Sequence, residues 1–338
     1  MDQLKSEQSS EDASAETERP NLIDRTADRL DALHRRIPPA AFLHGVIKKY
    51  GEDLCGQLAM LLTYRGFFAV FPLLLVFVNV VGIILDDNPE LRDQLIGSTV
   101  ASLPIIGTEI QNNSQSVGGS ALVVIFATLV SIWAGLGLLD MLQEALNTIW
   151  GVPRFERPPF LIRKLRSLPA VLMVGLALVI SGASAWIFGT GQSRLQVLGE
   201  YLLPFLAASL CVIGLHYVLC YRKVALSAVL PAALLTGVGW MALQQLGGWY
   251  VNRFVVNSSD TYGIFVVVFG LMSWIYLLAL VYLLGNEVSV VLLESRWPRS
   301  LTGRNLTPQD KAAVNDVLRR TLRVRDVDVD IDVPEHPR

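Results

Sequence analysis

Charged residues are scarce in this chain of 338 residues. Asp, Glu, Lys and Arg together make up 17% of it, against about 25% in typical soluble domains. Hydrophobic residues account for 52%, and the mean hydropathy is +0.45. This balance excludes an ordinary soluble enzyme and predicts a membrane protein.

Other residue types and motifs are also in short supply. Three cysteines and four histidines are scattered at spacings that fit neither a disulfide framework nor a metal site. The formal net charge is −2, which gives no general affinity for nucleic acid. No GxxxxGK[ST] motif is present to bind the phosphates of ATP. We therefore expect no catalytic site, no cofactor, no metal and no nucleic-acid partner.

Long apolar runs are abundant. A helix needs roughly 20 mostly apolar residues to cross about 30 Å of hydrocarbon. Six such windows occur, at residues 66–85, 119–139, 168–189, 201–220, 224–246 and 263–285. We expect an all-α polytopic membrane protein, with six transmembrane helices in a membrane domain over 58–293.

Positive residues predict the orientation, since Lys and Arg in short loops resist translocation. With Arg65 set aside at the border of the first window, 24 of the 28 Lys and Arg residues fall on one side and three on the other. Both termini are therefore expected in the cytoplasm, with the protein in a bacterial plasma (inner) membrane.

The N-terminal flank changes character along its length. Residues 1–20 are polar and predict a disordered tail. Residues 21–57 predict two amphipathic helices, the first of which ends before Pro38-Pro39. In the second, over 42–54, apolar residues lie opposite His44, Lys48 and Lys49. We expect it to lie along the inner leaflet as an interfacial helix, the alternative being a cytoplasmic helix packed on the loops.

The C-terminal flank, residues 294–338, is rich in charge and predicts a cytoplasmic tail. Near its end four aspartates alternate with aliphatic residues over 326–333. Alternation places the four carboxylates on one face of an extended strand. A solvated acidic tail or a short edge strand is expected there, because the Gly and Glu of a calcium-binding loop are absent.

Three ionisable residues border the windows on the cytoplasmic side. Arg65 enters the first window, Asp140 leaves the second, and Glu287 ends the sixth. Charges at this depth are costly, so we expect a polar cluster of the three at the inner mouth of the bundle. The alternative is that each side chain reaches water separately.

Three further residues stand out inside the windows. His216 is a candidate for an intramembrane polar site or proton relay, or else a neutral ring bonded to a neighbouring helix. Pro72 and Pro231 are candidate helix kinks, which membrane helices also tolerate without a function. Small residues in the third and fifth windows allow close helix packing and permit a homo-oligomer.

Several short motifs, taken together, resemble a known family. They are Phe71-Pro72-Leu73-Leu74, Leu146-Asn147, Gly151-Val152, Tyr262-Gly263, Trp274-x-Tyr276 and Leu284-Gly285-x-Glu287. In this order they resemble the YihY/virulence factor BrkB family of bacterial inner-membrane proteins, over residues of roughly 40–295. The resemblance implies a six-span helical bundle. Members of that family are described as transporters, and the older label ribonuclease BN has been attached to them.

Two classes of function follow. The first is a transporter, exporter or lipid-handling protein, whose partners are membrane lipids and a small-molecule or lipid substrate of unknown identity. The second is a membrane scaffold that serves envelope integrity without transport. A ribonuclease is disfavoured because no acid–base or metal constellation is evident in the sequence.

Overall fold

The computed structural model describes residues 31–84, 87–90, 93–94, 97, 121–188, 193–250, 263–301, 303 and 306–322. Over these ranges the chain is helical apart from turns and connecting segments, which confirms the all-α prediction. The predicted disordered tail over 1–20 and the acidic stretch over 326–333 lie outside the described residues.

Among the described residues, four helices are long and apolar enough to cross a membrane. They are α8 (Phe160–Phe188), α9 (Arg194–Leu219), α10 (Leu226–Tyr250) and α11 (Gly263–Leu293). These four contain or overlap the last four predicted windows. The first two windows fall in helices of 30 and 29 residues, α4 (Cys55–Ile84) and α7 (Ala121–Ile149).

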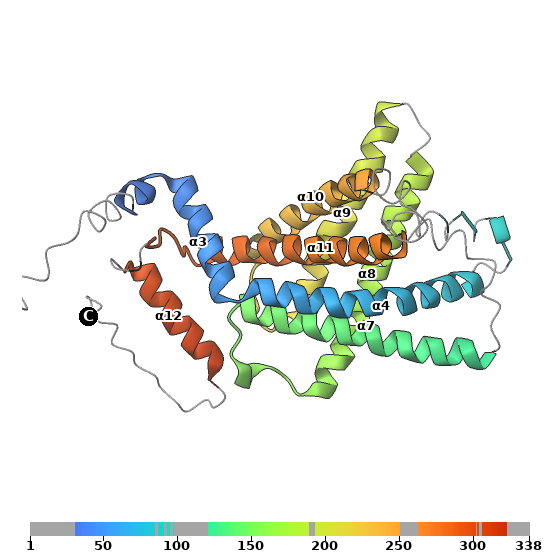
Figure 1. Cartoon of the computed structure of the whole chain (residues 1–338), viewed down its shortest axis with the longest axis horizontal. Coiled ribbons are helices and arrows are strands. Elements are labelled where there is room, and N and C mark those ends of the chain that lie inside the picture. Colours follow the sequence, from blue (N-terminus) through green and yellow to red (C-terminus); the bar gives the residue numbers. More distant parts are fainter. Residues whose placement is uncertain are drawn as a thin grey trace, which may run out of the picture.

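Helix α11 occupies the centre of the bundle, in contact with α4, α7 and α10 (Figure 1). Helices α8 and α9 pair with each other, and α9 also packs on α10. Leu146, Trp150, Leu219 and Leu283 contribute to the main apolar core and are each fully buried. The core therefore lies where α7, α9 and α11 meet.

Glycines allow α10 to approach its neighbours closely. A Cβ atom at Gly239 would lie 2.2 Å from Val281 of α11, and one at Gly237 would lie 2.4 Å from the Ser209 hydroxyl of α9. On α11, a Cβ at Gly285 would lie 3.1 Å from the carbonyl oxygen of Ala232. These small residues pack helix against helix, as the sequence predicted for the fifth window.

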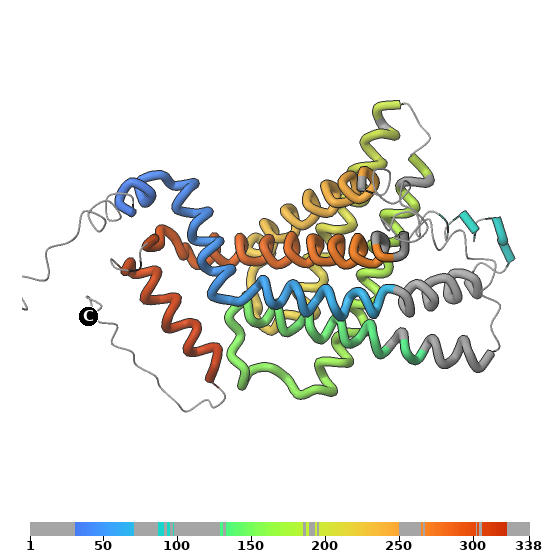
Figure 2. The backbone as a smooth tube through the Cα atoms, in the orientation of Figure 1, coloured from blue at the N-terminus to red at the C-terminus, as the bar shows by residue number. Residues whose placement is uncertain are grey.

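One end of the bundle is covered by two further helices, α3 (Pro38–Glu52) and α12 (Pro308–Thr321) (Figure 2). We call it the capped end. Helix α3 crosses this end and packs on α11 and α4. The turn into α4 is tight, with Leu54 at a φ of 54°, and the Leu54 carbonyl accepts the first amides of α4 from Gln57 and Leu58.

The described part of the first amphipathic helix ends at Arg36, as predicted, and α3 then begins at Pro38. The second amphipathic helix corresponds to α3, and the prediction that Lys49 lies on its polar, outward face is wrong. The side chain of Lys49 is buried together with Ala41, Gly45 and Val46, whereas Leu43 and Ile47 are each 58% exposed. The inward face is decided by contacts from other elements: the backbone of Arg296 lies 3.1 Å from where a Gly45 Cβ would be.

Two other expectations need correction. Helix α11 continues to Leu293, so Glu287 lies within the helix and is fully buried rather than at the end of the span. The C-terminal flank is also more ordered than a tail, since it forms α12 and buries Arg299, Ser300 and Asp310.

Pro72 and Pro231, the two candidate kinks, each lie inside a helix that continues past the proline. Pro72 lies inside α4, but its side chain is outside the described residues. Pro231 lies inside α10, and the next amide, that of Ala232, donates to the Ser289 hydroxyl of α11 at 2.8 Å. This bond ties α10 to α11 beside the proline. Pro169 and Pro204 also lie inside helices, α8 and α9.

Candidate functional site: buried polar groups in the bundle

A buried ion cluster joins α3 to α11 at the capped end. The Lys49 ammonium donates to Glu287 Oε2 at 2.7 Å and to Asp53 Oδ2 at 2.6 Å. The side chains of Lys49 and Glu287 are 1% and 0% exposed. Because an isolated charge in such a place is very costly, each of these groups depends on the others.

The remaining bonding capacity of this cluster is used by three other elements. Lys49 gives its third hydrogen bond to the carbonyl oxygen of Ile149, at the end of α7, at 2.9 Å. The Cys55 thiol, at the start of α4, donates to Glu287 Oε1 at 3.0 Å. Arg320 of α12 donates to Asp53 Oδ1. We call Lys49, Asp53, Glu287 and Arg320 the buried tetrad; its formal charges sum to zero.

Local geometry explains how the tetrad is assembled. Lys49 lies on the last turn of α3 and Asp53 is its C-cap, four residues on, so that their side chains meet. The tight turn at Leu54 then changes the direction of the chain, and Cys55 at the start of α4 lies beside Glu287 of α11. Glu287 lies at the same end because α11 continues beyond the apolar window.

A second charge network fixes α12 and the segment before it. Arg299 donates to both carboxylate oxygens of Glu52, at 2.8 and 2.6 Å, and to Asp310 at 2.9 Å. Lys48 donates to Asp310 at 2.8 Å. Burial raises the pKa of Asp310, but hydrogen bonds from Lys48 and from the amides of Ser300 and Thr307 outweigh it and hold the pKa well below the ordinary 3.8. The network attaches the C-terminal flank to α3.

The structure does not bring Arg65, Asp140 and Glu287 together. Arg65 is exposed and donates to the carbonyl oxygen of Gly137 in α7 at 2.8 Å. Asp140 lies 3.2 Å from Arg163 and 4.0 Å from Lys164, and Glu287 belongs to the tetrad. The predicted cluster thus separates into three sites, because Arg65 meets α7, Asp140 meets α8, and Glu287 meets α3 and the start of α4.

His216 lies on α9 in the centre of the core and is fully buried. Its ring contacts Trp150 edge-on, with centroids 4.4 Å apart, and Tyr217 at 5.6 Å. Both ring nitrogens lack a hydrogen-bond partner among the described residues. His216 therefore differs from the expected alternative of a ring bonded to a neighbouring helix.

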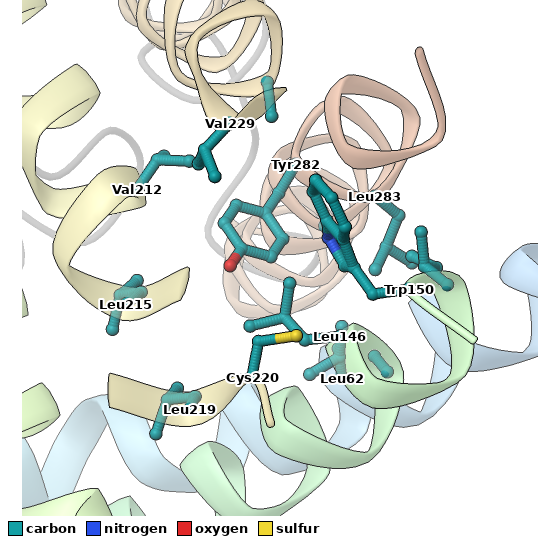
Figure 3. Packing of buried hydrophobic residues seen from close by; sticks show 14 of the residues in the cluster. Leu62, Leu146, Trp150, Val212, Leu215, Leu219, Cys220, Val229, Tyr282 and Leu283 are labelled. Carbon is teal, nitrogen blue, oxygen red and sulfur yellow. The ribbon is translucent and has the colours of Figure 1, made fainter. Parts of the chain in front are cut away.

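Buried side chains with this property also include Gln143 and Trp274, through Oε1 and Nε1, and three hydroxyl-bearing residues of α9, α10 and α11. Tyr282, Thr236 and Ser209 are 8%, 8% and 6% exposed, and within the described ranges their hydroxyl oxygens have no partner. With His216 they come from α9, α10 and α11, and we call the four the unpartnered polar set. Figure 3 shows the ring of Tyr282 between Trp150 and Val229, with its hydroxyl directed towards the side of Leu215 and Cys220. Buried polar groups are nearly always paired in native proteins, so that each exception requires an explanation.

Neighbouring polar residues in the core are, in contrast, well paired. Asn147 of α7 accepts from the Tyr221 amide at 2.9 Å and donates to the Leu219 carbonyl at 3.3 Å, which caps the end of α9. Trp150 donates through Nε1 to Asn286 at 3.0 Å. Asn147, Trp150 and Asn286 are therefore hydrogen-bonded, in contrast to the unpartnered set.

Sequence reasoning missed most of the tetrad and the whole of α12. Lys49 was assigned to the polar face of an interfacial helix, and Arg320 to a tail. One signal was available: Thr307 and Asp310 form a capping box, each side chain bonding the backbone amide of the other, at the start of α12. In the part of the chain that the structure describes, no group of three or more His, Cys, Asp or Glu residues is placed to hold a metal ion.

Comparisons with known proteins identify membrane proteins among the relatives of this chain. A UPF0761 membrane protein of Acinetobacter baylyi is 27% identical over 262 residues, which cover 74% of this chain and 62% of that protein. A second, of Nitrosospira multiformis, is 23% identical over 289 residues, 82% of this chain and 66% of that protein. The chain thus spans less than two thirds of the length of these two relatives.

A third relative, YfkH of Bacillus subtilis, is 24% identical over 75% of this chain and 95% of its own length, and its name calls it ribonuclease-like. No solved structure matches this chain. The sequence profile described as virulence factor BrkB matches residues 46–310, well over half of the chain, and includes Lys49, Asp53, His216 and Glu287 but not Arg320. The chain is a multi-pass membrane protein that belongs to the virulence factor BrkB family.

Proposed function

We propose that this protein binds and moves a polar or amphipathic small molecule, or a lipid, between α9, α10 and α11. The observation that carries the proposal is the unpartnered polar set. Two imidazole nitrogens and three hydroxyls are buried in helices that can cross a membrane, and none of them has a partner in the part of the chain that the structure describes. Leaving such groups unpaired costs about 1–3 kcal/mol each, and a polar ligand or its accompanying water would pair them.

The same proposal includes six membrane spans, with α4 and α7 as the first two. A helix of 29 or 30 residues is about 45 Å long, enough to cross the hydrocarbon and leave the capped end outside it. The excess of Lys and Arg on that side supports a cytoplasmic capped end and cytoplasmic termini. The exposed Leu43 and Ile47 of α3 support contact of that helix with the inner leaflet of a bacterial plasma membrane.

We propose a non-enzymatic role, with membrane lipids as the surrounding partners and no nucleic-acid partner. The buried charges support this reading, because Lys49 and Glu287 are engaged in ion pairs inside the protein rather than directed at a surface that RNA could reach. The ribonuclease-like name of the Bacillus relative stays with that protein.

The test is Tyr282→Phe, which removes one unpartnered hydroxyl and leaves the ring in place. Native mass spectrometry of the protein released gently from its own membrane reports any retained lipid or small molecule. We expect the wild-type protein to retain a specific molecule and the variant to lose at least half of it. Removal of a buried unpaired hydroxyl should leave the thermal midpoint unchanged or raised.

Tyr276→Phe is the matched control, since it makes the same change on the same helix at a half-buried position. It should retain the molecule at the wild-type level. Equal retention by wild-type protein and Tyr282→Phe would contradict the proposal. Retention of a second polypeptide in place of a small molecule would favour the scaffold function instead.

A further inference from the structure

The buried tetrad has an arrangement that links proton binding to the position of α12. Glu287 is surrounded by ionisable groups from four elements. These are Lys49 and Tyr50 on α3, Asp53 at its C-cap, Cys55 on α4, Glu294 just after α11, and Arg320 on α12. Farther out, Arg222 and Arg296 pair with Glu294, and Arg296 also pairs with Asp316 of α12. Of the tetrad, only Arg320 comes from α12, in the C-terminal flank.

The charge balance depends on Arg320. With α12 docked, two carboxylates face one ammonium and one guanidinium, and the tetrad is neutral. Release of α12 also removes Asp316, but that side chain is 35% exposed, and Arg296 keeps Glu294 as a partner. Within the tetrad, the three remaining groups then carry a net charge of −1, and in the docked protein Lys49, Asp53 and Glu287 are 1%, 5% and 0% exposed. A net charge buried in this way is strongly unfavourable.

One proton restores neutrality in the undocked state. A proton from bulk water can bind the Glu287 carboxylate, which leaves Lys49 paired with Asp53 and keeps the Cys55 sulfur beside a neutral acid. With α12 docked, the same proton would give a net charge of +1, again unfavourable in a buried site. The tetrad residues are therefore neutral in two states: with α12 docked and Glu287 ionised, and with α12 undocked and Glu287 protonated.

We propose that Glu287 is a proton-binding site whose occupancy is linked to the docking of α12 through Arg320. Linkage is reciprocal: if release of α12 increases the proton affinity, protonation weakens docking by the same factor. The inference deepens the proposed function and rests on it in one respect, since the proton would be the ion coupled to transport. Arg320 lies outside the segment matched by the family profile, so the linkage would be a feature of the C-terminal flank.

The test measures undocking of α12 by thiol labelling of the full chain. Ala313 is 1% exposed and Val314 is 41% exposed, both on α12. In a background of Cys55→Ser, Cys211→Ala and Cys220→Ala, a maleimide is applied to Ala313→Cys and to Val314→Cys over about pH 5–8, a range in which buried carboxylates can titrate. The ratio of the two labelling rates cancels the pH dependence of the thiol itself.

In the wild-type background we expect this ratio to rise as the pH falls, by up to about tenfold per pH unit for one linked proton. Glu287→Gln should give a high ratio independent of pH. Arg320→Gln should also remove the pH dependence, since docking no longer changes the charge of the tetrad, and Arg320→Lys should restore it.

A flat ratio in the wild-type background, or a wild-type profile in Arg320→Gln, would overturn the proposal. Arg320 is a partly exposed residue of an end helix, so this variant remains informative if Glu287→Gln fails to fold. The labelling involves no transported molecule. A flat ratio together with ligand loss in Tyr282→Phe would therefore refute the linkage and leave the proposed function standing.

Discussion

Lys49 provides the strongest test of how the capped end is held together. Its ammonium is the partner of two buried carboxylates and one backbone carbonyl, from three different elements. In Lys49→Met, Asp53 keeps Arg320, but Glu287 keeps only the Cys55 thiol. Removal of one partner from a buried pair costs about 3–5 kcal/mol, which corresponds to roughly 6–10 °C at about 2 °C per kcal/mol for a large chain.

The assay is thermal unfolding in a mild detergent, followed by a dye that becomes fluorescent on reaction with thiols. The three cysteines are buried or half-buried and free, so they report unfolding without any engineered probe. Lys48→Met is the matched control, one residue away on the same helix. Lys48 is 26% exposed, and its partner Asp310 keeps Arg299, so we expect a loss of about 1 kcal/mol.

The double variant Lys49→Met/Glu287→Gln separates charge from packing. It removes the uncompensated carboxylate, and we expect it to recover most of the stability lost in Lys49→Met. If Lys49→Met melts within 2 °C of Lys48→Met, or if the double variant is no more stable than the single one, the reasoning is refuted.

Three other predictions concern the helices and the C-terminal flank. Asn147→Ala leaves the Tyr221 amide and the Leu219 carbonyl unpaired, and we expect a loss of about 2–4 kcal/mol in the thermal assay. Gly239→Ala brings a methyl group into Val281 and should destabilise by about 1–3 kcal/mol, whereas Gly248→Ala on the same helix meets nothing within 4 Å and should be neutral or stabilising by up to about 1 kcal/mol. Because the pKa of Asp310 is lowered in the folded protein, its ionised carboxylate contributes fully to stability above pH 3.8, and this stabilisation is lost as the pH falls towards the pKa of the folded state. Asp310→Asn should lose the same stabilisation at neutral pH. Hydrogen exchange of the Ser300 and Thr307 amides measures both effects.

Each of these predictions has an outcome that contradicts it. An unchanged midpoint for Asn147→Ala would mean that water pairs the freed backbone groups. Equal midpoints for Gly239→Ala and Gly248→Ala would show that α10 and α11 can separate without cost. Exchange at the two amides that stays slow below pH 3, or is unchanged in Asp310→Asn, would remove Asp310 as the residue that anchors α12. The pH at which Asp310 is protonated lies below the range of about pH 5–8 used for the labelling of α12. The two effects can therefore be measured separately.

The sequence by itself determined the class of the protein and the places of its long helices. Six apolar windows were sufficient, because the length of a span follows from the thickness of the hydrocarbon and depends on no partner. Four of them coincide with helices able to cross a membrane, and the other two lie in α4 and α7. The family could also be recognised from short motifs, since it depends on residue order and not on contacts.

The partners of the charged residues were decided only by the tertiary structure. The sequence pattern places Lys49 on the polar face of its own helix, yet its partners include α7 and α11, from sequence positions 100 and 238 residues away. Arg65, Asp140 and Glu287 lie at similar depth in the sequence pattern, but α8 and α3 supply nearer partners for two of them. Hydropathy gives the depth of a residue in the membrane, whereas the direction of a side chain around its helix, and thus its partner, depends on how helices pack.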